Sequence, residues 1–117
     1  MLETLLRDEW TAVEVLTRHL RREYEILKTR DVPGLEQVVH EKAVCAEHLR
    51  VLIAKRLDYL QEQGFDTDRE GLAASIAVAS PALRDALARL AADLEQAAEQ
   101  ARTQNKINGA VIAASRS

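Results

Sequence analysis

The apolar residues of this 117-residue chain recur at alternating steps of four and three along three long stretches, and this periodicity limits the possible folds most strongly. Such steps place apolar side chains along one face of an α-helix. The chain has only four glycines, two prolines and 3% aromatic residues, too few turn-forming and strand-favouring residues for a β-sandwich or barrel. The sequence therefore predicts an all-α protein, and its length indicates a single domain over residues 1–117.

The periodic stretches predict long helices over residues 2–28, over residues 32–63 and from Pro81 onward, and residues 69–79 are expected to form a short helical crossover. Because the first connection is short, consecutive long helices should run antiparallel. We expect an antiparallel, coiled-coil-like bundle of three long helices with a short helical crossover before the last. The apolar face of the first stretch consists of Leu2, Leu6, Val13, Leu16, Leu20 and Leu27.

Residues typical of helix ends occur at the expected boundaries. Asp31 can cap the second helix, with Pro33 in its first turn. Gly64 can supply a left-handed residue where that helix ends. Ser80 followed by Pro81 is typical of the start of a helix.

Lys42 and Arg56 occupy positions on the second helix where the period calls for an apolar residue. Polar residues at such positions often fix the register of packed helices or pair with an acid across the interface. Glu9 and Glu23 occupy corresponding positions on the first helix. These two acids are the expected partners of the two cations.

The net charge is -3, and the basic and acidic residues are interleaved, so no basic face for nucleic acid is expected. The single cysteine, Cys45, cannot form an internal disulfide, which fits a reducing compartment. The first ten residues contain three acids and do not resemble a secretory signal, and no apolar run approaches the roughly 20 residues of a membrane span. These features predict a cytoplasmic protein.

Glu41, Cys45 and His48, with His40 beside them, are spaced to lie on one helix face and are the first candidates for chemistry. A helical metal site would need Glu-x-x-His or His-Glu-x-x-His spacing, which is absent. A Cys45–His48 nucleophilic pair would lack a third, orienting group. We therefore expect no catalytic residues, no metal and no cofactor, and long helices leave little concave surface for a small-molecule substrate.

The run from Asn105 to Ile112 allows two interpretations. In the first, which the pattern alone favours, the helix ends at Asn108 and Gly109 is its left-handed cap. In the second, Gly109 is a flexible joint in an amphipathic helix that offers Ile107, Val111 and Ile112 to a partner.

The sequence resembles the FlgN family of flagellar export chaperones. The Leu-Leu-x-x-Glu segment from Leu5 to Glu9, the positions of Lys42 and Arg56, and the turn at Gly64 are all similar to the family pattern. The most specific element is Asn105-x-x-Asn108-Gly109-x-x-Ile112. Family members usually continue well beyond this motif with another amphipathic stretch, whereas these 117 residues stop shortly after it. We therefore expect either that part of the binding helix is missing or that the 117 residues are only an ordered core.

The resemblance implies a cytoplasmic protein without catalytic activity. It implies that the chain binds the helical terminal segments of hook–filament junction (hook-associated) proteins, keeps them unpolymerised, and contacts a membrane protein of the export gate transiently. It also implies that the C-terminal portion binds the partner, so residues 103–117 are expected to be a more mobile, partner-binding extension. The alternative is a generic coiled-coil scaffold or dimerisation module. The predicted partner-binding residues are Asn105, Ile107, Asn108, Gly109, Val111 and Ile112.

Overall fold

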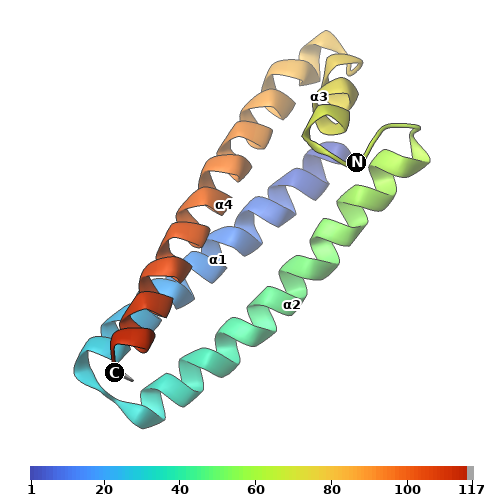
Figure 1. The fold of residues 1–117 in the computed structure, drawn as a ribbon. Helices are drawn as coiled ribbons and strands as arrows, with labels where there is room; N and C mark the ends of the chain where they lie inside the picture. Colours follow the sequence, from blue (N-terminus) through green and yellow to red (C-terminus); the bar gives the residue numbers. More distant parts are fainter. Residues whose placement is uncertain (116–117) are drawn as a thin grey trace.

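The structure, a computed structural model, describes residues 1–115, and within them it is all-helical, as predicted. The last two residues of the predicted extension 103–117 lie outside the described part. The molecule is elongated, with extents of 52 × 22 × 20 Å. Its long helices run along its length (Figure 1). The four helices of the described residues are α1 (Leu2–Thr29), α2 (Val32–Glu62), α3 (Arg69–Ala77) and α4 (Pro81–Ser115).

The helix boundaries follow the signals in the sequence. The Asp31 carboxylate accepts a hydrogen bond from the Gly34 backbone N–H at 3.1 Å, which caps α2. Gly64, after the end of α2, has a φ of +83°, the left-handed conformation that glycine adopts without strain. Asp68 caps α3 through the Gly71 N–H at 2.8 Å. The predicted helix ends are thus confirmed to within two residues at these positions.

Helix α1 is the element against which the other long helices pack. Its broad apolar stripe contacts α2 on one side and α4 on the other. Figure 1 shows α1 between these two helices. The core contains side chains from α1, α3 and α4, namely Leu2, Leu6, Val13, Leu20, Ile76, Leu87, Leu94, Ala97 and Ala101.

The predicted bundle of three long helices is not confirmed in detail. In the described residues α2 and α4 do not pack against each other, and each packs along α1. A closed bundle would need a second apolar face on both helices. Instead each has one narrow buried row of side chains, and that of α4 changes to Ala97 and Ala101. Among the long helices, α2 and α4 therefore each contact only α1, through this one row of side chains.

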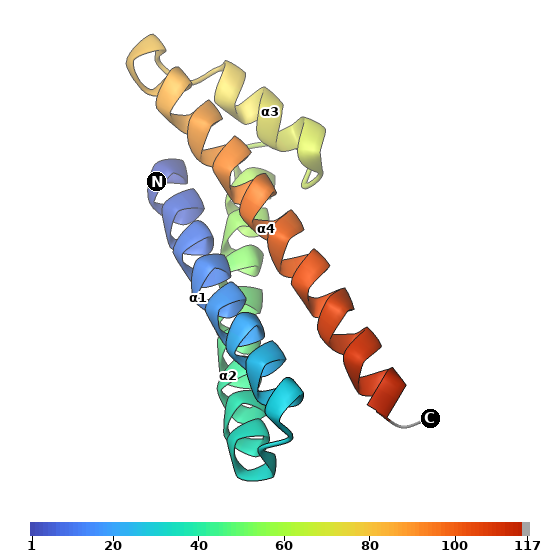
Figure 2. The ribbon, with the colours of Figure 1, turned by 90° about the vertical axis from the view of Figure 1, so that its left-hand side faces the viewer.

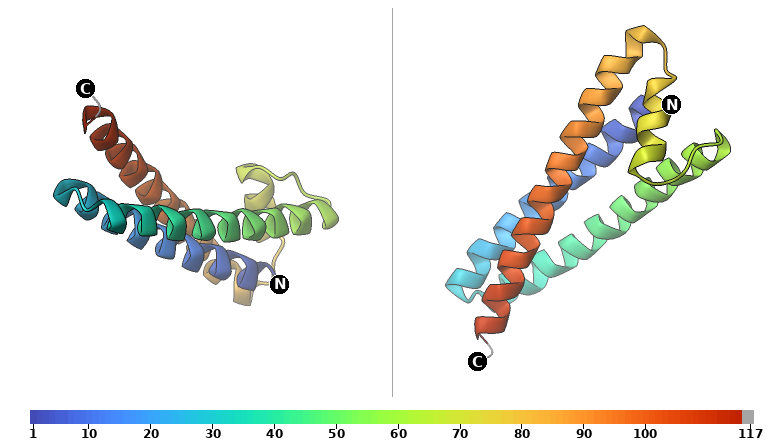
Figure 3. Two further views of the ribbon diagram at one scale, coloured as in Figure 1. Left: turned by 90° about the horizontal axis from the view of Figure 1, so that it is seen from below. Right: turned by 45° about the horizontal axis from the view of Figure 1, so that its top comes forward.

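Helix α3 lies between α2 and α4 at one end of the molecule and packs on both (Figures 1 and 3). Its Ile76 side chain is buried in the core, and Gly71 is buried beside the preceding loop. A Cβ atom on Gly71 would come within 1.8 Å of the Asp66 carbonyl oxygen. The connection before the last helix is therefore itself a helix, α3, which packs between α2 and α4.

We predict that Gly71→Ala lowers the free energy of unfolding by about 1–3 kcal/mol, because the added methyl group forces a backbone shift. Gly109→Ala is the matched control: it lies inside α4 with no atom within 4 Å of the added Cβ, and alanine should raise stability by roughly 0.5–1 kcal/mol. Urea unfolding followed by circular dichroism measures both changes. Equal effects of the two substitutions would contradict the packing of α3.

Candidate functional site

The predicted partner-binding segment lies in the last third of α4, which continues as a helix to Ser115. The interpretation in which the helix ends at Asn108 is therefore wrong. Gly109 is helical and is not a left-handed cap, because Gly64 is the only glycine with positive φ among the described residues. Asn108 and Gly109 instead occupy consecutive helical positions with different environments.

Asn108 is the buried polar centre of this segment, with 1% of its surface exposed. Its side-chain N–H groups donate to the Leu20 carbonyl oxygen and to Glu23 Oε1, both at 2.8 Å. Its Oδ1 accepts from Gln104 Nε2 at 3.0 Å. The amide thus uses both of its donor hydrogens and its acceptor oxygen, and it joins α4 to α1.

Glu23 extends this network to the second helix. Its other carboxylate oxygen, Oε2, lies 2.8 Å from Lys42 Nζ. One carboxylate therefore contacts side chains from both α2 and α4 at the point where α1 lies between them. A buried carboxylate is stable only when it is paired and hydrogen-bonded, and Glu23 meets both conditions.

A second ion pair lies two heptads away along the same two helices. Arg56 binds Glu9 through two hydrogen bonds, Nε to Oε1 at 2.6 Å and Nη2 to Oε2 at 3.3 Å. The predicted pairing of Lys42 and Arg56 with Glu9 and Glu23 is confirmed. The two pairs together fix the antiparallel register of α1 and α2, since a shift of one residue would separate both.

The other predicted residues differ in exposure. Ile107 is 42% exposed, and Asn105 and Gly109 are also exposed. Val111 and Ile112 are half-buried. Five of the six predicted residues are thus accessible at least in part, whereas the Asn108 side chain is enclosed by α1 and α4. Asn108 is a polar residue on the otherwise apolar row of α4, just as Lys42 and Arg56 are polar residues on the apolar row of α2. This feature of the sequence could have indicated a buried amide.

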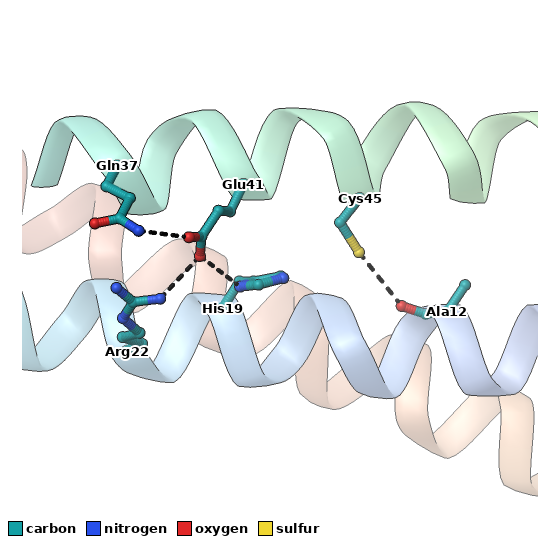
Figure 4. A network of polar contacts seen from close by, with 6 residues as sticks. All are labelled: Ala12, His19, Arg22, Gln37, Glu41 and Cys45. Atoms are coloured by element: carbon teal, nitrogen blue, oxygen red, sulfur yellow. Dashed lines mark hydrogen bonds and ion pairs between the residues drawn. The ribbon is translucent and has the colours of Figure 1, made fainter. Parts of the chain in front are cut away.

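The Glu41, Cys45 and His48 face lies over a different groove, of about 510 Å³, between α1 and α2. Figure 4 shows Glu41 binding Arg22 Nη1 at 2.8 Å, with His19 Nδ1 at 3.6 Å, while the Cys45 thiol points to the Ala12 carbonyl oxygen at 3.7 Å. Within residues 1–115 no three metal-ligating side chains come together. Burial raises the pKa of the Cys45 thiol, which disfavours the nucleophilic thiolate.

These features define a class: an all-helical protein in which two long helices flank a central one, and the second of these two, α4, carries a partly exposed Asn-x-x-Asn-Gly-x-x-Ile segment. No helix in residues 1–115 is long and apolar enough to cross a membrane. A model of the FlgN protein family matches residues 1–117. The chain therefore belongs to the FlgN family, whose members are chaperones of flagellar biogenesis.

The fold is similar to a crystal structure from Pseudomonas aeruginosa that is described as a flagella synthesis protein FlgN. The TM-score is 0.84 at 24% sequence identity, over 93% of this chain and 84% of that one. At this identity the likeness shows the fold alone. A comparison with curated proteins finds no match.

We predict that Asn108→Ala lowers the free energy of unfolding by about 1–3 kcal/mol, because it removes the partners of Glu23 Oε1 and of the Gln104 amide in a buried place. The exposed neighbour Asn105 supplies the control, and Asn105→Ala should change stability by no more than about 0.5 kcal/mol. Urea titration at neutral pH compares the two. If Asn108→Ala is as stable as the unaltered protein, the amide does not hold α4 on α1.

We also predict that Cys45 reacts with iodoacetamide at pH 8 about tenfold or more slowly in the folded protein than in urea, because burial shields the thiol and its raised pKa lowers the thiolate fraction. Mass spectrometry of the alkylated protein over time measures the rate. A rate equal to that of the unfolded chain would show that the thiol is accessible and ionises normally.

Proposed function

We propose that this chain is a flagellar export chaperone that binds hook–filament junction proteins in the cytoplasm, keeps them unpolymerised and delivers them to the export gate. The match of the whole chain to the FlgN family carries this proposal. The protein acts by binding alone, without a cofactor, and contacts the membrane-embedded gate protein only transiently. Its partners present helical terminal segments, which a helical protein can cover along their apolar faces.

The proposed binding segment is residues 103–117, with Asn105, Ile107, Gly109, Val111 and Ile112 as the contacting residues and Asn108 as the residue that holds the segment in place. The accessible side chains of Ile107, Val111 and Ile112 support this assignment. We further propose that the segment is the most mobile part of a single domain. Beyond Ala101, Asn108 is the only buried residue of α4 in the described part, so little burial resists local opening.

A loosely held segment suits a carrier that must release its cargo. Ordering the segment on binding consumes part of the interaction free energy, which keeps the affinity moderate. A moderate affinity permits handover at the gate, whereas a fully preformed interface of the same area would dissociate more slowly.

Isothermal titration of the purified chain with hook–filament junction proteins tests this function. We expect binding by the whole chain, no binding after deletion of residues 103–117, and at least about tenfold weaker binding of Ile112→Glu, because a charge replaces an apolar contact. Ala110→Glu places the same charge on an exposed position of α4 and should bind normally.

Circular dichroism and urea unfolding establish that each variant is folded before its affinity is compared. Normal binding by the deleted chain would move the site away from residues 103–117. The absence of binding by the whole chain to every junction protein would overturn the proposed partner class.

A further inference from the structure

The opening between α2 and α4 has a regular floor. Its residues come from α1 and α2 and form three layers that are one heptad apart along both helices. The two outer layers are ion pairs, and the middle layer consists of two half-buried leucines packed against the core. In order, the layers are Glu9–Arg56, Leu16–Leu49 and Glu23–Lys42.

In both ion pairs the acid lies beneath the cation. The Glu23 side chain is 1% exposed and that of Lys42 is 26% exposed, while the values for Glu9 and Arg56 are 6% and 17%. The accessible charge of the floor is therefore positive. An acidic group entering the opening would approach Lys42 and Arg56 without meeting their buried partners closely.

Toward α3 the opening contains a hollow of about 740 Å³. Small and apolar side chains line most of its inner surface. The charged lining residues are three cations and three acids, namely Arg56, Arg69, Arg102, Glu9, Asp68 and Glu95. Arg69 pairs with Glu95, and Arg102 on the α4 wall pairs with Glu99 of its own helix at 2.7 Å. Such a surface allows the close approach of a helix with an apolar stripe. The more exposed members of the two ion pairs of the floor, Lys42 and Arg56, favour acidic residues beside that stripe. The apolar lining comes from α3 and α4 and includes Leu72, Ile76, Ala91, Leu94 and Ala98.

The chain's own helix α3 occupies one end of this same opening. It packs on both α2 and α4, and it directs Leu72 and Ile76, one turn apart, toward the core. At 1.5 Å per residue its nine residues cover about 14 Å, against about 52 Å for the 35 residues of α4. A helix therefore fits between α2 and α4, and no segment within residues 1–115 covers the rest of the opening.

The α4 wall continues from the hollow into the proposed binding segment. Ala98 and Arg102 line the hollow, and heptad spacing places Asn105, Gly109 and Ile112 on the same flank of α4. Ile107 lies on the opposite flank with Gln100. Three of the five proposed contacting residues thus face the opening, whereas Ile107 and Val111, one turn apart, face away from it.

We propose that an amphipathic helix of the partner, with acidic residues beside its apolar stripe, docks in the opening between α2 and α4 in line with α3 (Figures 1 and 2). Its apolar residues pack on Leu16, Leu49 and Ala98, as Leu72 and Ile76 of α3 do on α4. Its carboxylates meet Arg56, Arg102 and Lys42. This inference rests on the proposed function and specifies which surface of the chaperone receives the cargo.

Charge reversal at Arg102 tests the docking surface by isothermal titration with the hook–filament junction protein that binds the unaltered chain. We expect Arg102→Glu to weaken binding about tenfold or more, because it opposes the acids of the incoming helix. Arg89→Glu makes the same charge change on the opposite flank of α4 and should alter the affinity less than about twofold.

A second matched pair tests the α2 wall. Ala46 lies one turn from Lys42 on the flank turned toward α4, whereas Val44 lines the separate groove between α1 and α2. Both are exposed, so Ala46→Glu and Val44→Glu should both fold. We expect only Ala46→Glu to weaken binding. Equal affinities of all four variants, with binding by the unaltered chain intact, would overturn the docking surface and leave the proposed function standing.

A photo-crosslinking residue identifies the occupant directly. A crosslinking residue that replaces Asn105 faces the opening. One that replaces Thr103 lies on the opposite flank of the same helix turn. We expect crosslinks to an acidic, amphipathic segment of the junction protein from Asn105 and not from Thr103. Crosslinks from Asn105 to a second copy of this chain, or crosslinks to the junction protein from Thr103 alone, would overturn the proposal. If the unaltered chain binds no junction protein, the proposed function fails first.

Discussion

The Glu23 carboxylate is the interaction on which the arrangement of the long helices depends. Its two oxygens contact Asn108 of α4 and Lys42 of α2, and it is itself almost fully buried in α1. Because the desolvation of a buried carboxylate is offset only by good geometry, this contact selects one register for both neighbours of α1. The ion pair of Glu9 and Arg56, two heptads away, favours the same register of α1 and α2. Apolar rows alone would tolerate a heptad slip, whereas these polar contacts do not.

An open arrangement follows from this dependence on α1. With α2 and α4 held by the central helix and, at one end, by α3, the rest of the face between them is uncovered within residues 1–115. In the docking that we propose, this face would receive a helix of the partner without a rearrangement of the core of the chaperone. The buried row of α4 changes from leucine to alanine and then to a single asparagine, which limits how firmly the C-terminal part of α4 is held on α1.

Much of the fold could be predicted from residues that act locally. Asp31, Gly64 and the four-and-three spacing each act over one or two helical turns, and the structure confirms the helices that they indicate. The pairing of Lys42 and Arg56 with two acids was also predictable, because a charge on an apolar row needs a partner of opposite sign. The burial of Asn108 was not predicted, although the position carries the same signal. An amide is uncharged and suits both a buried network and an exposed contact, so sequence alone does not distinguish the two.

The sequence by itself determined the helices, their ends except for the end of the last one, the pairing of α1 with α2 through two ion pairs, and the family to which the chain belongs. Only the tertiary structure decided that α2 and α4 stay apart, that α3 packs between them, and that Gly109 continues a helix which Asn108 holds in place. The physical reason is the range of the forces. Helix propensity, capping and heptad spacing are properties of neighbouring residues. Whether a face is covered depends on the sum of contacts among helices far apart in the chain, and it is settled only when all of them are packed.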